Sequence, residues 1–112
     1  MKNSIYIAVS DKMAACPFPE AYIVCGNGDY EIVFSFDNAW SAHVKKTARF
    51  IWNNQYIDVE FTGDTVEVPI LSNTTLLKVG VYAGDLISSS PAEIKCIPSI
   101  ICEHGVVAYG SN

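Results

Sequence analysis

The chain has 112 residues, of which 50% are hydrophobic and 17% are charged, a composition typical of a folded domain and not of a disordered segment. Its formal net charge is −5, and Lys45, Lys46 and Arg49 form the only local basic cluster, which argues against direct nucleic-acid binding. A chain of this length can bury a sufficient core without a metal or a disulfide.

The N-terminal residues 1–9 have too short an apolar run for a signal peptide, so we expect them to form a first strand. No stretch of the sequence approaches the length of a membrane span. These two features predict a soluble protein that is made in a cytoplasm and has no membrane partner. We expect one domain, residues 1–112.

Four cysteines could in principle form disulfides: Cys16, Cys25, Cys96 and Cys102. Without a signal peptide, however, free thiols are favoured, with Cys25 and Cys96 partly buried as small apolar side chains. The alternative is a Cys96–Cys102 or a Cys16–Cys25 bridge. The spacings match no common zinc pattern, so we expect no metal and no cofactor.

Residues 21–25 and 30–36 flank Asn27-Gly28, a dipeptide that is a strong signal for a two-residue hairpin loop. Such a loop places apolar residues opposite each other in three pairs: Cys25–Tyr30, Ile23–Ile32 and Ala21–Phe34. The apolar register therefore predicts an antiparallel hairpin.

A second hairpin is predicted between residues 47–52 and 56–61, with Asn54-Gln55 as its loop. This loop sets Trp52 opposite Ile57 and Phe50 opposite Val59, and on the other face it pairs Arg49 with Glu60. Residues 66–70 are predicted to follow as a third strand, with their apolar residues opposite 57–61. Pro69 indicates that this strand lies at an edge or ends there.

Two further strands are predicted at residues 76–82 and 91–97, and Gly80 inside the first indicates a bulge or the close approach of another chain. Residues 37–43 are an irregular link with room for one helical turn. The predicted fold class is an all-β, antiparallel sandwich, immunoglobulin-like or small-barrel-like, with about seven or eight strands.

In the predicted register, Glu60 and Glu67 face each other on the outer side of the sheet, in the manner of a glycosidase acid–base pair. A flat, exposed sheet offers no cleft that would separate their pKa values, so we interpret them as part of a solvated row. Cys25–Asp29 contains a G-x-G but leads into a strand, which makes it a turn and not a phosphate-binding loop. His43 and His104 have no partner nucleophile in the local sequence, and we predict no catalytic residue.

Aromatic residues divide by alternation into two groups. Five are predicted to lie in the core: Phe34, Phe36, Phe50, Trp52 and Phe61. Tyr56 and Tyr82 fall on the opposite face, where exposed aromatic side chains often mark contact surfaces. We take Tyr56, Tyr82 and Trp40 as candidate partner-contact residues; partial burial and a sugar-binding platform are the alternatives.

A further set of segments begins at about Tyr30: YEIVFSFD (30–37) with Trp40 behind it, KTARF (46–50), DV (58–59), VPIL (68–71), VGVYAGDL (79–86), SPAEIKC (90–96) and SIIC (99–102). In these segments the sequence resembles a β-sandwich module found at the N-terminus of phage baseplate upper proteins and tail-fibre proteins from gut Firmicutes. The matching residues are structural ones. They therefore indicate a fold and an origin better than a task.

The resemblance implies a non-enzymatic virion protein that is assembled in the host cytoplasm. It is expected to form a symmetric homo-oligomer and to bind other virion proteins. Its members continue beyond residues 99–102 into a fibre or receptor-binding part, whereas this chain stops at Asn112, so a baseplate or tail component and a head decoration protein both stay open. We expect residues 1–18 or 103–112 to act as extended arms over a neighbouring subunit. The alternative function is a carbohydrate- or receptor-binding module on the virion surface.

Overall fold

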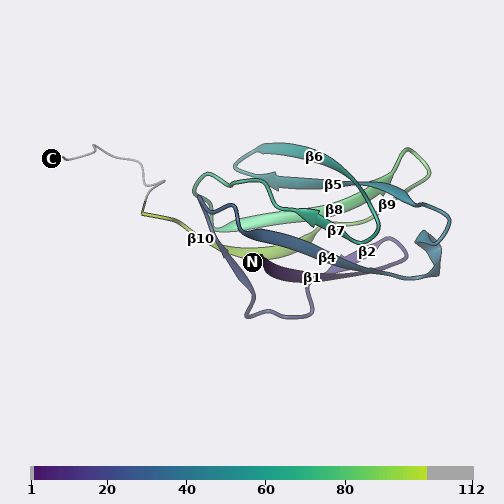
Figure 1. Cartoon of the computed structure of the whole chain (residues 1–112), viewed down its shortest axis with the longest axis horizontal. Helices are drawn as coiled ribbons and strands as arrows, with labels where there is room; N and C mark the ends of the chain where they lie inside the picture. The colour runs from purple at the N-terminus through teal and green to yellow at the C-terminus, as the bar shows by residue number, and fades with distance from the viewer. Residues whose placement is uncertain (1, 101–112) are drawn as a thin grey trace, which may run out of the picture.

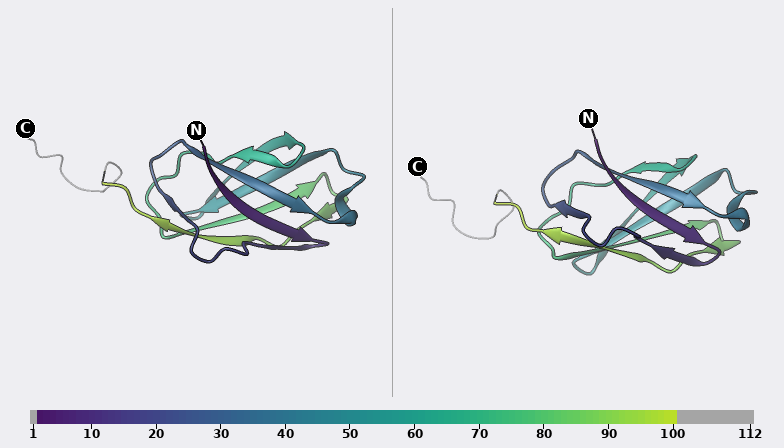
Figure 2. Two further views of the ribbon diagram at one scale, coloured as in Figure 1. Left: turned by 60° about the horizontal axis from the view of Figure 1, so that its bottom comes forward. Right: turned by 90° about the horizontal axis from the view of Figure 1, so that it is seen from below.

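The period-two alternation of the sequence becomes a series of strands in the structure, a computed structural model that describes residues 2–100. Within these residues ten strands form two sheets that face each other (Figure 1; Figure 2), with a single 3₁₀ turn, η1 (Asn38–Trp40), as the helical element. The strands are β1 (Asn3–Ser10), β2 (Met13–Ala15), β3 (Tyr22–Val24), β4 (Tyr30–Phe36), β5 (Lys45–Trp52), β6 (Gln55–Thr62), β7 (Thr65–Glu67), β8 (Leu76–Ala83), β9 (Ile87–Ser88) and β10 (Ala92–Ile97). The all-β sandwich class is confirmed.

The smaller sheet has the order β2-β1-β4-β7, and the larger has the order β3-β10-β8-β5-β6, with β9 beside β8. Most strands turn apolar side chains toward the other sheet. These side chains form one continuous core, whose most buried members include Ile7, Ile32, Phe50, Leu77, Val79 and Ile94. The predicted strands at 76–82 and 91–97 are confirmed as β8 and β10, and so is the helical turn after residue 37.

The sheets are mixed and not purely antiparallel, which differs from the sequence-based expectation. β1 runs parallel to β4, from Asn3 opposite Tyr30 to Val9 opposite Phe36. β3 likewise runs parallel to β10. Parallel neighbours need a long crossover between them. The segment from β2 through β3 supplies it for β1 and β4, because it leaves the smaller sheet, adds a strand to the larger one and returns.

The predicted hairpin of residues 21–25 with 30–36 is wrong, because β3 and β4 belong to different sheets. The Asn27-Gly28 segment lies in a link that carries the chain from one sheet to the other. In this link Gly26 adopts the positive φ of 79°, and its N–H donates to the Leu71 carbonyl at 2.9 Å. The apolar residues of the two segments resemble the matched rows of a hairpin because the inward rows of both sheets face the same core.

The second hairpin is confirmed as β5–β6, but its loop is Asn53-Asn54 and its register is shifted by two residues from the prediction. Both asparagines have positive φ, 50° and 59°, as a two-residue hairpin loop requires. A shift of two keeps each side chain on its face while changing its partner. Phe50 therefore lies opposite Ile57, and Arg49 lies opposite Asp58 and not Glu60.

The predicted third strand of this meander also joins the other sheet. Gly63, with φ of 80°, turns the chain after β6, and β7 then pairs with β4 so that Val66 lies opposite Ile32. β7 is an edge strand that ends at Glu67, as Pro69 indicated. Gly80 pairs regularly with Arg49, without a bulge, and a Cβ there would make only ordinary contact, 3.5 Å from the Ser89 hydroxyl oxygen.

The N-terminal residues are part of the sandwich and not an arm over a neighbouring subunit, at least as far as Ala15. β1 lies in the middle of the smaller sheet, between β2 and β4, and buries Ile5, Ile7 and Val9. The expectation of an arm at residues 1–18 is therefore wrong for the two strands that it contains. The second expected arm, residues 103–112, lies outside the described residues.

We predict that replacing Leu77 with Ala lowers the free energy of unfolding by about 2–5 kcal/mol, because Leu77 is fully buried and the change leaves a cavity. The matched control is Leu86→Ala, since Leu86 is 78% exposed; its effect should stay within about 0.5 kcal/mol. Urea unfolding followed by tryptophan fluorescence measures both values. Equal effects of the two substitutions would contradict the core assignment.

Candidate functional site

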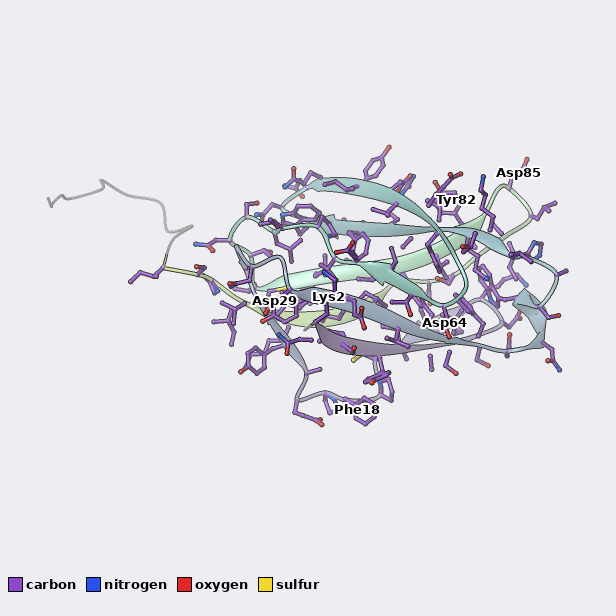
Figure 3. All side chains as sticks on the ribbon, viewed as in Figure 1. Lys2, Phe18, Asp29, Asp64, Tyr82 and Asp85 are labelled. Carbon is purple, nitrogen blue, oxygen red and sulfur yellow. The ribbon has the colours of Figure 1, made fainter. Side chains whose placement is uncertain are left out.

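The outward face of the larger sheet carries a group of polar and aromatic side chains across three adjacent strands. β5 pairs with β6 on one side and with β8 on the other, so that Arg49 lies between Asp58 and Gly80. Tyr56 of β6 and Tyr82 of β8 stand on the same face. We call Arg49, Tyr56, Asp58 and Tyr82 the Arg49 cluster; Figure 3 shows Tyr82 among the side chains of the molecule.

Asp58 is the acceptor at the centre of the cluster. The Arg49 guanidinium donates to both carboxylate oxygens, with Nε–Oδ1 and Nη2–Oδ2 distances of 2.8 and 2.9 Å. The Tyr82 hydroxyl donates to Oδ2 at 2.8 Å. A two-pronged Arg–carboxylate pair fixes orientation better than a single contact does. The three side chains therefore hold one another in place on the outward face of the sheet.

Both tyrosine rings also contact the guanidinium. The Arg49 Cζ lies 4.1 Å from the centroid of the Tyr56 ring and 5.5 Å from that of Tyr82, within the range of cation–π interaction. Tyr56 remains 59% exposed, so one edge or face of its ring is open to solvent. The cluster thus presents an ordered aromatic surface whose charges are already paired.

The hydrogen bonds of the cluster change its ionisation. The Arg49 hydrogen bond, assisted by the one from Tyr82, holds the pKa of Asp58 below its usual value against the opposing effect of desolvation. The hydrogen bond to Asp58 raises the pKa of the Tyr82 phenol, and burial adds to this. Both shifts favour one protonation state, an ionised Asp58 beside a neutral Tyr82.

The structure brings together two of the three predicted contact residues. Tyr56 and Tyr82 share the Arg49 cluster, whereas Trp40 is only 1% exposed and its indole Nε1 donates to the Asp11 carbonyl at 2.7 Å. Trp40 is therefore a core residue here, and its ring offers no contact surface. It follows the short link after β4, where no alternation indicates which way a side chain points.

Arg49 and Asp58 belong to the cluster but were not among the predicted contact residues. Arg49 was predicted to lie opposite Glu60 because the loop was placed at Asn54-Gln55. The available signal was the Asn53-Asn54 dipeptide, since asparagine tolerates positive φ better than most residues do. With that loop, the Arg49–Asp58 pair follows from the register alone.

The carboxylates that were predicted to face each other are in different sheets. Glu60 lies opposite Thr47 in β5, and its carboxylate is 3.8 Å from the Lys45 ammonium. Glu67 lies opposite Glu31 in β4 and accepts a hydrogen bond from Lys2 at 2.6 Å. The predicted proximity of the two carboxylates depended on the predicted three-stranded meander, and the structure does not contain that meander.

Cysteines and histidines contribute no assembled site within residues 2–100. Cys16, Cys25 and Cys96 are free thiols, and burial, followed by the neighbouring Cys25, raises the pKa of Cys96 to about 12. Among these residues no group of three or more His, Cys, Asp or Glu could hold a metal ion, and no helix is long and apolar enough to cross a membrane. Cys102 and His104 lie outside the described residues.

No protein-family model, no curated protein and no solved structure matches the chain. The resemblance to phage structural proteins stays a prediction from the segments quoted above.

We predict that Asp58→Asn destabilises the protein at neutral pH and that the difference from the wild type disappears in acid. Because the pKa of Asp58 is lower in the folded state, its stabilising effect is present above the unfolded value of about 3.9 and is lost as the pH falls through the folded value. Chemical unfolding at a series of pH values measures this difference.

Glu60→Gln is the matched control, because it removes a carboxylate from the outward face of the same strand, near Lys45 and outside the cluster. A second readout is the phenol titration of Tyr82, whose pKa should fall toward the ordinary value in Asp58→Asn and stay raised in Glu60→Gln. An unchanged Tyr82 titration in Asp58→Asn would contradict the described hydrogen bond.

Proposed function

We propose that this chain is a non-enzymatic structural module of a bacteriophage virion, which associates with further copies of itself and with other virion proteins. The phage-type segments between residues 30 and 102 support this origin. The observation that carries the assembly role is the Arg49 cluster. Arginine and tyrosine are enriched at the centres of protein interfaces, where ordered side chains lose little entropy on association.

The Arg49 cluster suits a contact surface for two physical reasons. Its charges are paired before any partner arrives, so burying them leaves no lone charge without a counter-ion. Its exposed Tyr56 ring adds apolar area at the rim of the cluster. Closed cyclic symmetry is the usual form of such self-association.

The test is the concentration dependence of the molar mass in solution, measured by light scattering and sedimentation. We expect the wild type to form a closed oligomer, and we expect Tyr56→Ala and Arg49→Ala to weaken it by about 2 kcal/mol, roughly 30-fold. Glu93→Ala is the control, because Glu93 is exposed on β10, outside the cluster. A wild-type chain that stays monomeric at high concentration would contradict self-association.

A carbohydrate-binding function is the second candidate, because the exposed Tyr56 ring could stack on a sugar. Arg49 already lies 4.1 Å from that ring, which leaves one of its faces for a ligand. We expect weak, millimolar glycan binding on an array if this function holds, and its loss in Tyr56→Ala. Tyr82→Phe, which keeps the ring and removes the hydroxyl, is the matched control. No binding at millimolar sugar would rule the candidate out.

A further inference from the structure

Lys46 turns its side chain into the protein, unlike the other lysines that the structure describes. It occupies the inward row of β5 together with Ala48, Phe50 and Trp52, and it is only 6% exposed. Among the described residues it is the one buried charged side chain. Lysine is rarely buried without a partner, so its surroundings require an explanation.

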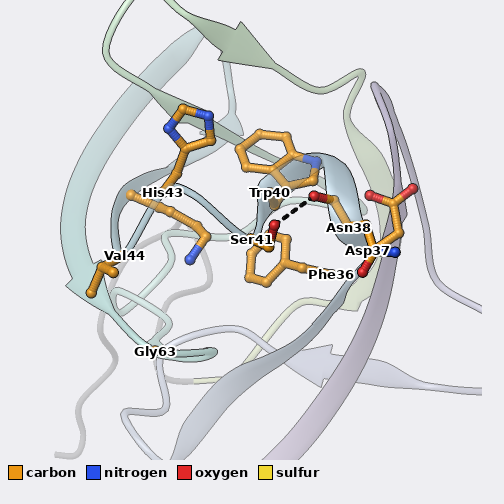
Figure 4. A pocket seen from close by; sticks show the side chains of 9 residues that line it. Phe36, Asp37, Asn38, Trp40, Ser41, His43, Val44 and Gly63 are labelled. Atoms are coloured by element: carbon orange, nitrogen blue, oxygen red, sulfur yellow. Dashed lines mark hydrogen bonds between the residues drawn. The ribbon is translucent and has the colours of Figure 1, made fainter.

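The side chain lines a pocket of about 350 Å³ at the end of the sandwich (Figure 4). The walls come from the end of β4, η1 and the start of β5, and Gly63 of the β6–β7 turn closes one side. Phe36, Trp40 and His43 supply rings, and Asn38 and Ser41 supply polar groups. The pocket therefore combines an aromatic wall with a small number of polar atoms, the usual make-up of a small-molecule site.

The Lys46 ammonium has no anionic partner in the described chain. Its Nζ lies 4.6 Å from the centroid of the Phe36 ring, and it forms no hydrogen bond or ion pair with residues 2–100. Asp37, the carboxylate that lines the pocket, is engaged elsewhere. Its Oδ2 accepts from the Asp11 N–H at 2.7 Å and its Oδ1 from the Ala39 N–H at 3.1 Å.

A buried charge without a counter-ion is costly, and the contact with one aromatic ring offsets only part of that cost. An anion in the pocket would remove the imbalance. The pocket offers one cation, and the Ser41 hydroxyl already donates to the Asn38 carbonyl at 2.8 Å. This donor set matches a single negative charge better than a phosphate, which usually takes an arginine fork or a row of backbone amides.

We propose that this pocket binds a carboxylate, held by the Lys46 ammonium, with its apolar part against the Phe36 ring. The carboxylate belongs either to a free organic acid or to an acidic residue of a neighbouring copy of the chain. This inference does not depend on the assembly role of the Arg49 cluster, which lies on the opposite face of β5.

Benzoate is the probe, because it combines one carboxylate with an aromatic ring, and benzamide is its neutral counterpart. In spectra of the ¹⁵N-labelled wild type we expect benzoate to shift the amides of Phe36, Trp40 and Ser41 in a saturable way, with a millimolar dissociation constant. Benzamide should shift them weakly and without saturation. Equal responses to both compounds, or none to benzoate, would overturn the proposal without any variant being needed.

Lys46→Met removes the charge and keeps the length of the side chain, and we expect it to weaken benzoate binding by roughly tenfold or more. Lys45→Met is the matched control, since Lys45 is the exposed neighbour and should leave binding unchanged. Circular dichroism verifies that both variants fold. A Lys46→Met variant that folds and binds benzoate as tightly as the wild type would overturn the role of Lys46.

The two sources of the carboxylate differ in their effect on association. If a neighbouring copy supplies it, Lys46→Met lowers the oligomer mass and added benzoate competes with assembly. If a free acid supplies it, benzoate binds and the mass does not change. Benzoate binding in an otherwise monomeric chain would sustain this proposal while contradicting self-association, so the failures of the two proposals can be told apart.

Discussion

The parallel pairing of β1 with β4 is the constraint on which the rest of the sandwich depends. It places Ile5, Ile7 and Val9 beside the inward row of β4, and together these rows make the smaller sheet's half of the core. Polar contacts reinforce the same seam, for example the hydrogen bond from the Ser4 hydroxyl to the Glu31 carboxylate. Without this pairing the smaller sheet would divide into two separate pairs, β2–β1 and β4–β7, and could not cover the larger sheet as one layer.

The sequence was sufficient to predict which side of most strands faces inward, because alternation reports burial directly. It was not sufficient to predict which strand lies beside which. β3 and β4 have complementary apolar rows although they belong to opposite sheets, since both rows enter one core. The candidate site could be predicted only in part. Tyr56 and Tyr82 followed from alternation, but predicting the Arg49–Asp58 contact required the correct loop, Asn53-Asn54. Trp40, in an irregular link, offered no pattern at all.

β5 carries a cation to each side of the larger sheet, and the two cations differ in their partners. Arg49 on the outer face is held by a carboxylate and two rings, whereas Lys46 on the inner row has a single ring beside it. Alternation would have identified Lys46 as inward-facing, since it shares the parity of Ala48, Phe50 and Trp52. Inward charges on edge strands can discourage edge-to-edge association of sheets, but β5 is paired on both sides, so this role does not explain Lys46.

The pairing of β3 with β10 has a consequence for how the protein is made. β3 has no other neighbour in its sheet, and its partner is the last strand of the described chain. The ribosome releases residues from the N-terminus onward. Ile23 and Cys25 therefore stay exposed until residues 92–97 have emerged. Completion of the larger sheet therefore waits until β10 has been synthesised. Until then β3 has no strand partner in its sheet.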